Sequence, residues 1–153
     1  MKSVNSCEVC AVLPTNRPIF ETDHWIISLS PDQGYLGRCY VTLKKHKGDL
    51  ADLNLEEWTE LRSVIQRLES ATRSALGATM FNWGCLMNNA YQNTPALPHI
   101  HWHFRPRYDK SVIFDGIEFS DPHFGHHYDR DQKFDAPAEL IASITAAIRT
   151  HLH

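Results

Sequence analysis

The sequence predicts an α+β fold: a mostly antiparallel sheet of five or more strands, with one central and one C-terminal helix. Two observations favour this class. Several short segments rich in β-branched and aromatic residues lie between turn signals, as strands do. Two longer segments have the apolar spacing of helices, and no strand–helix–strand alternation of the kind a parallel sheet needs is present.

The first half of the chain contains two predicted strands. Residues 24–30 (HWIISLS) and 38–43 (RCYVTL) are rich in strand formers. Residues 31–34 (PDQG) have the composition of a turn. We therefore expect the two strands to form a hairpin-like pair.

The central helix is predicted between Asn54 and Gly77. Asn54 can cap the first turn, and Glu57 three residues later completes a capping-box pattern. Gly77 is typical of a C-terminal cap. The residues at helical spacing are Trp58, Leu61, Ile65, Leu68, Thr72 and Ala75. We expect this stripe to face the core.

Two further strands are predicted at residues 79–87 and 99–105, joined by a loop at 88–98. Proline cannot donate to a sheet ladder, so Pro106 is expected to end the second of these strands. Residues 111–119 can add another strand.

The last part of the chain is predicted to be irregular and then helical. Residues 121–134 are polar and lack periodicity, whereas residues 137–151 place Leu140, Ile141, Ile144 and Ile148 on one helical face. Because the sequence contains no internal repeat and no obvious linker, residues 1–153 are expected to form a single domain.

Length and charge exclude several classes of function. The net charge is −3, so the chain has no surplus of basic residues for nucleic acid. No apolar run approaches the roughly 20 residues that span a bilayer. Residues 1–6 lack the apolar stretch of a secretion signal. We expect a cytoplasmic protein that binds neither nucleic acid nor membrane.

Histidine occupies every second position at the start of the strand predicted at 99–105: His99, His101 and His103. Because side chains alternate along a strand, the three imidazoles would share one face, opposite the bulky apolar residues between them. Such a row can supply nucleophiles, proton carriers or metal ligands. A surface strand that merely carries histidines is the alternative.

The run HIHWHFRPR at residues 99–107 resembles the signature of the histidine triad family of nucleotide hydrolases and transferases. The resemblance continues through KKH at 44–46 and FNWG at 81–84. It covers residues 7–108, which implies a triad-family core followed by a C-terminal extension that ends in the helix at 137–151.

The resemblance implies a role for two of the histidines. His101 would attack the α-phosphorus of a nucleotide and form a nucleotidyl-histidine that water hydrolyses. His103 would contact the phosphate or the leaving-group oxygen. Related uridylyltransferases carry glutamine at this third position, so the histidine favours a hydrolase. The implied substrates are dinucleoside polyphosphates or nucleoside phosphoramidates.

The resemblance also implies nucleotide-binding positions. Asn82 would help to hold the nucleotide, and Ser30 stands where an acidic or amide residue usually binds the ribose. Arg107 and Arg105 can meet substrate phosphates or be only solvated. The phosphate loop departs from the family, since residues 94–96 are Thr-Pro-Ala in place of Gly-Gln-Ser or Gly-Gln-Thr.

A Cys-x-x-Cys pair at Cys7 and Cys10 is a weak signal by itself. Some triad proteins and the uridylyltransferases bind zinc through such a pair, a histidine matching His46 and the first triad histidine, here His99. The resemblance therefore implies a structural zinc site of the Cys2His2 type. The resemblance implies no catalytic cofactor. It also implies that the protein forms a homodimer.

Three alternatives remain open from the sequence. In the first, the triad binds a nucleotide without turnover, as a sensor does. In the second, the three alternating histidines hold a catalytic zinc ion, although ligands along one strand splay apart. The group His123, His126 and His127 can form another metal or substrate contact, or lie in a solvated loop.

Overall fold

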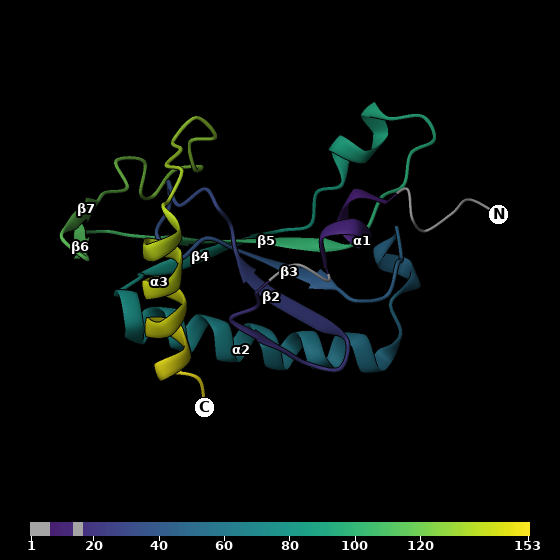
Figure 1. Ribbon diagram of the computed structural model, residues 1–153, viewed down its shortest axis with the longest axis horizontal. Coiled ribbons are helices and arrows are strands. Elements are labelled where there is room, and N and C mark those ends of the chain that lie inside the picture. Colours follow the sequence, from purple (N-terminus) through teal and green to yellow (C-terminus); the bar gives the residue numbers. More distant parts are fainter. Residues whose placement is uncertain (1–6, 14–16) are drawn as a thin grey trace.

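The computed structural model describes residues 7–13 and 17–153 and confirms the predicted α+β class. Residues 1–6, in which no secretion signal was found, lie outside the described residues. A five-stranded antiparallel sheet has the strand order β1-β2-β3-β5-β4 (Figure 1). The strands are β1 (Phe20–Glu21), β2 (Trp25–Leu29), β3 (Cys39–Leu43), β4 (Met80–Gly84) and β5 (His101–Arg107).

Two longer helices accompany the sheet: α2 (Leu55–Leu76) runs along one face, and α3 (Ala138–Thr150) packs across α2 (Figure 1). A short helix, α1 (Glu8–Val12), precedes the sheet and was not predicted. Two short 3-10 helices, η3 (Leu50–Asp52) and η4 (Asn88–Gln92), lie in connecting loops. Among the described residues, no helix combines the length and the apolar character needed to cross a membrane.

The capping prediction for α2 is confirmed. The Asn54 side chain accepts from the Glu57 N–H, and the Glu57 carboxylate accepts from the Asn54 N–H. Gly77 ends the helix with a φ of +79°, in the left-handed region that favours glycine. The buried face is rotated from the predicted stripe, however, because Trp58 is 41% exposed while Val64 is fully buried.

The expectation that Pro106 ends the histidine strand is wrong. Strand β5 continues through Arg107. On one side its pairing with β3 stops at Phe104, whereas on the other side β4 pairs as far as Arg107. At Pro106 the strand therefore has a neighbour on one side only, which is where proline is tolerated in a sheet.

The start of β5 also differs from the prediction. The strand begins at His101, so His99 lies in the segment before it. The strand at 79–87 ends early, at Gly84. The region 111–119 is a separate hairpin of β6 (Val112–Phe114) and β7 (Ile117–Phe119). Asp115 and Gly116 both have positive φ, as a type I′ turn requires.

Asn54→Ala should lower the free energy of unfolding by about 1 kcal/mol, because the first turn of α2 loses the side-chain acceptor of its cap. Urea unfolding followed by circular dichroism measures the change. Ser70→Ala, at an exposed position within the same helix, is the matched control and should change stability by less than about 0.5 kcal/mol. Equal effects of the two substitutions would contradict the role of the cap.

Candidate functional site

Strand β5 divides its side chains between two faces of the sheet. Trp102 pairs with Val41, and Phe104 pairs with Cys39, in the hydrophobic core. The alternate residues point to the opposite, polar face: His101, His103, Arg105 and Arg107. The polar face of β5 therefore carries two of the three predicted triad histidines and two arginines in one row.

His101 is held in one tautomer by the backbone. Its Nδ1 lies 2.8 Å from the carbonyl oxygen of His99. A carbonyl can only accept, so Nδ1 carries the proton and Nε2 keeps its lone pair. The ring is half-buried and lies 5.0 Å from the ring of His103, centroid to centroid. The lone pair is thus available on the polar face.

His103 is neutral at physiological pH. Burial lowers its pKa to about 4, with further contributions from His101, Arg38 and Arg105. The ring of Tyr40, its partner on β3, packs edge-on at 5.3 Å. A neutral imidazole can donate one hydrogen bond to an oxygen that gains charge.

His99 points to a cluster of potential metal ligands and not along the row of His101 and His103. Its Nδ1 lies 3.6 Å from Cys7 Sγ, 3.3 Å from Cys10 Sγ and 3.2 Å from His46 Nδ1. The distance from Cys10 Sγ to His46 Nδ1 is 3.4 Å. The four ligand atoms all lie within 4.8 Å of one another.

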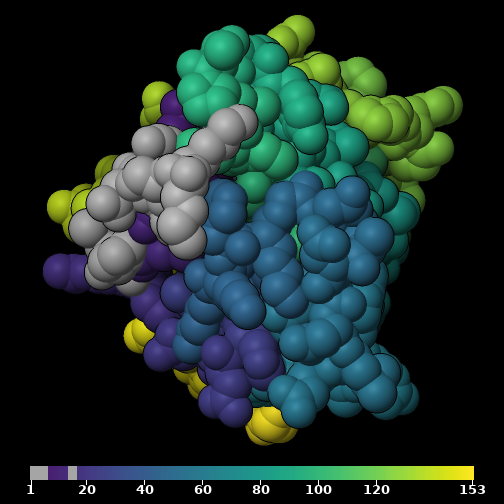
Figure 2. All heavy atoms as spheres, turned by 90° about the vertical axis from the view of Figure 1, so that its right-hand side faces the viewer, coloured from purple at the N-terminus to yellow at the C-terminus, as the bar shows by residue number. Residues whose placement is uncertain are grey.

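The cluster forms where two loops meet at the end of the sheet. The Ile100 N–H donates to the Lys47 carbonyl at 2.8 Å, which joins the loop after β3 to the segment before β5. Figure 2 shows this end of the molecule, with the blue loop below the green segment. His99 Nε2 donates to the Leu43 carbonyl at 2.6 Å, so its Nδ1 faces the thiols.

These four residues fit a tetrahedral zinc ion. With zinc–sulfur bonds of about 2.3 Å and zinc–nitrogen bonds of about 2.0–2.1 Å, ligand atoms lie about 3.3–3.8 Å apart. Four of the six distances between ligand atoms are 3.2–3.6 Å, close to those of such a tetrahedron, and all six are within 4.8 Å. Two thiols and two imidazoles are also the donor set that zinc prefers.

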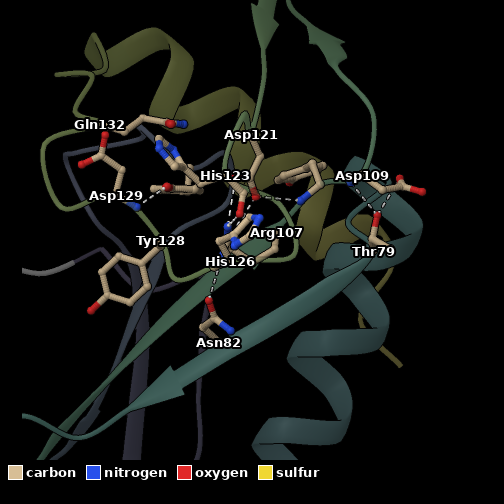
Figure 3. A network of polar contacts seen from close by, with 12 residues as sticks. Thr79, Asn82, Arg107, Asp109, Asp121, His123, His126, Tyr128, Asp129 and Gln132 are labelled. Atoms are coloured by element: carbon tan, nitrogen blue, oxygen red, sulfur yellow. Dashed lines mark hydrogen bonds and ion pairs between the residues drawn. The ribbon is translucent and has the colours of Figure 1, made fainter.

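Arg107 is fully engaged by the chain itself. It is 2% exposed, and its five N–H groups are all bonded (Figure 3). The acceptors are both carboxylate oxygens of Asp121, the side-chain oxygen of Asn82 and the carbonyls of His123 and His126. The guanidinium thus attaches the segment after β7 to the polar face of the sheet.

The structure places the other predicted nucleotide contacts as follows. Asn82 lies on β4 opposite Arg105 and keeps its amide nitrogen available while its oxygen accepts from Arg107. Ser30 is 1% exposed, and its hydroxyl accepts from the Asp32 N–H. Their roles toward a nucleotide stay predictions.

Two residues on the polar face, Arg38 and Tyr128, were not predicted from the sequence. Arg38 comes one residue before β3 and forms an ion pair with Asp32 at 2.6 Å. Arg38 and Tyr40 alternate along the strand predicted at 38–43, and this spacing could have indicated that their side chains share a face. Tyr128 lies in the irregular segment, and its ring covers the guanidinium of Arg105 at 3.7 Å. No periodicity in that segment could have placed it.

Comparisons with known proteins agree with this arrangement. The HIT domain profile matches residues 14–110. A Zn-bound histidine triad family protein from Mycobacterium smegmatis is 26% identical with a TM-score of 0.59, covering 95% of this chain and 94% of that one. A Hit-like protein from Bartonella henselae, involved in cell-cycle regulation, is 20% identical with a TM-score of 0.71, covering 98% of each chain. No curated protein sequence matches the chain.

Arg107→Ala should lower the free energy of unfolding by about 3–5 kcal/mol, because it leaves the buried carboxylate of Asp121 without its partner. Chemical denaturation measures the loss, and hydrogen exchange should become faster at residues 121–128. Arg130→Ala, at an exposed position of the same segment, is the control and should have little effect. A comparable loss in both variants would show that the buried contacts are not responsible.

Proposed function

The chain belongs to the HIT domain family, and from that premise we propose that it is a nucleotide phosphohydrolase. It cleaves at the α-phosphorus of dinucleoside polyphosphates or nucleoside phosphoramidates and passes through a nucleotidyl-histidine. The observation that carries the proposal is the hydrogen bond from His101 Nδ1 to the His99 carbonyl, which leaves a nucleophilic Nε2 on the polar face.

The reaction has two displacements at phosphorus. In the first, the Nε2 lone pair of His101 forms a bond to the α-phosphorus, and the bond to the leaving group breaks with its electron pair. A phosphate leaving group departs as an anion, whereas an amine takes up a proton from the solvent as it departs. In the second, water attacks the same phosphorus and gives up a proton to the solvent, the phosphorus–nitrogen bond breaks, and the electron pair returns to Nε2. The protein is regenerated, and a nucleoside monophosphate is released.

The neighbours of His101 stabilise the charge that develops. His103, neutral because burial lowers its pKa to about 4, donates a hydrogen bond to the phosphate or the departing oxygen. The Asn82 amide nitrogen holds the nucleotide near the nucleophile, and Ser30 bonds a ribose hydroxyl. Arg107 contributes through Asn82, whose oxygen it holds at 3.0 Å.

We further propose that Cys7, Cys10, His46 and His99 hold a structural zinc ion. The fit of their ligand atoms to a tetrahedron supports this. A zinc ion with four protein ligands has no open position for a reactive water, so it supplies rigidity and no chemical step. Because the His99 carbonyl orients His101, a fixed His99 backbone keeps the nucleophile aimed.

His101→Ala should reduce turnover of a dinucleoside polyphosphate by several orders of magnitude, since it removes the nitrogen that attacks phosphorus in the proposed mechanism. Product formation by chromatography measures the loss. The variant should keep its melting temperature and still bind nucleotide. Full activity in this variant would falsify the proposed mechanism.

Cys10→Ser should remove most of the bound zinc and lower the melting temperature, because the tetrahedral set loses a thiolate. Metal content by mass spectrometry, with about one zinc ion expected for each wild-type chain, measures the change. Cys85→Ser is the matched control: Cys85 is a half-buried thiol outside the cluster and should keep the metal. Unchanged zinc content in Cys10→Ser would refute the site.

Rapid quenching during turnover should trap a nucleotide on His101, detectable as a mass increase of the protein and mapped by peptide sequencing. The covalent species distinguishes a hydrolase from a protein that only senses a nucleotide, because binding alone leaves no phosphorus–nitrogen bond. If nucleotide binds but no adduct and no product form, the sensing function replaces the hydrolase.

A further inference from the structure

Arg105 is a buried positive charge that forms no ion pair within the described ranges, 7–13 and 17–153. Its side chain lies on the polar face two residues after His103 and is 8% exposed. Its Nε has no hydrogen-bond partner. Buried charges are normally paired, since burial removes their hydration. The guanidinium of Arg105 is therefore a buried charge without a carboxylate partner, and it is available to an anionic ligand.

The carboxylates near Arg105 already form ion pairs with other arginines. Asp121 accepts two hydrogen bonds from Arg107, and Asp32 is paired with Arg38 at 2.6 Å. Asp32 also accepts two backbone N–H groups of the loops around it. Three arginines thus share two carboxylates on this part of the sheet, and Arg105 is the one without a direct ion pair.

Aromatic rings hold the Arg105 guanidinium without using all of its donors. The Tyr128 ring lies over the guanidinium at 3.7 Å, and the Tyr35 ring lies at 5.7 Å. Stacking occupies the flat faces of a guanidinium, whereas its N–H groups point outward in the plane. The arrangement therefore fixes the orientation of Arg105, and its Nε donor is left without a partner.

Arg38 adds a second set of donors at the same level of the sheet. It directly precedes Cys39, which pairs with Phe104, so the backbone register places Arg38 beside Arg105. Its Nε is also buried without a partner. Alternate residues of a strand are about 7 Å apart. The two arginines consequently lie just beyond His103, on the side away from His101.

We propose that Arg105, with Arg38 beside it, binds a second anionic group of the substrate, a phosphate carried by the leaving group. The identity of the reacting group rests on the function proposed above. Ser30 lies next to Arg38, and Asn82 lies opposite Arg105. The nucleoside and the leaving-group phosphates therefore share this row of the sheet, with the ribose at its Ser30 end and the phosphates over the arginines beyond His103. The site therefore selects dinucleoside polyphosphates, whose leaving group keeps phosphate charges, over phosphoramidates, whose leaving amine is neutral.

Binding of inorganic tripolyphosphate, measured by isothermal titration calorimetry on the full chain, tests the site without requiring turnover. Arg105→Gln should weaken binding about 10- to 100-fold, as expected for the loss of charge-assisted hydrogen bonds. Arg62→Gln is the matched control: it removes the same charge from an exposed position on α2, the helix on the other face, and should change binding less than about twofold.

Kinetics with two substrates then test the selectivity. Arg105→Gln should lower kcat/KM for a dinucleoside polyphosphate by about the same 10- to 100-fold factor. For a nucleoside phosphoramidate the change should be less than about threefold. Equal losses on both substrates would make Arg105 a structural residue and overturn the proposal.

Two further variants keep the test valid if Arg105→Gln folds poorly, which circular dichroism will show. Arg105→Lys keeps the charge but loses the planar fork that the rings orient, so it should bind tripolyphosphate more weakly than wild type and more tightly than Arg105→Gln. Arg38→Gln should weaken binding by more than threefold. Wild-type binding that neither arginine affects would overturn the site. Binding that depends on Arg105, in a protein that turns over neither substrate, would overturn the hydrolase while leaving the anion site intact.

Discussion

The pleat of β5, bonded between β3 and β4, is the constraint on which the rest of the structure depends. A period of two sends Trp102 and Phe104 into the core and His101 and His103 to the polar face. A slip of one residue would bury the imidazoles and expose the aromatic rings. The packing of the core therefore sets the positions of His101 and His103.

His99 connects the two sites that the sequence places in one run. Its ring faces the thiols of Cys7 and Cys10, while its carbonyl accepts the Nδ1 proton of His101. The ring is fixed from its other side by the Leu43 carbonyl. One residue thus contributes its side chain to the Cys7–Cys10–His46 cluster and its backbone to the orientation of His101, so the two groups of residues are directly linked.

The HIT match covers residues 14–110, and the segment that follows it also contributes to the polar face. Asp121 and two carbonyls attach this segment to Arg107, and Tyr128 covers Arg105. Arg107 and Arg105 differ in how many of their hydrogen-bond donors have a partner. Arg107 has every donor satisfied and holds the chain together, whereas Arg105 is oriented by aromatic rings and its Nε donor has no partner.

The sequence by itself determined the features that depend on local chemistry. Periodicity and capping residues predicted α2 from Asn54 to Gly77 and the α+β class, because a helix cap and a strand pleat are properties of neighbouring residues. The spacing of the histidines likewise identified the segment that carries the triad.

Only the tertiary structure decided which of these groups act together. It placed His99 outside β5, let the strand run through Pro106, and brought Arg38 and Tyr128 to Arg105. Whether a charge is paired depends on segments distant in the chain, here residues 32, 121 and 128 around one strand. No local pattern encodes such contacts, because they arise from the packing of the whole chain.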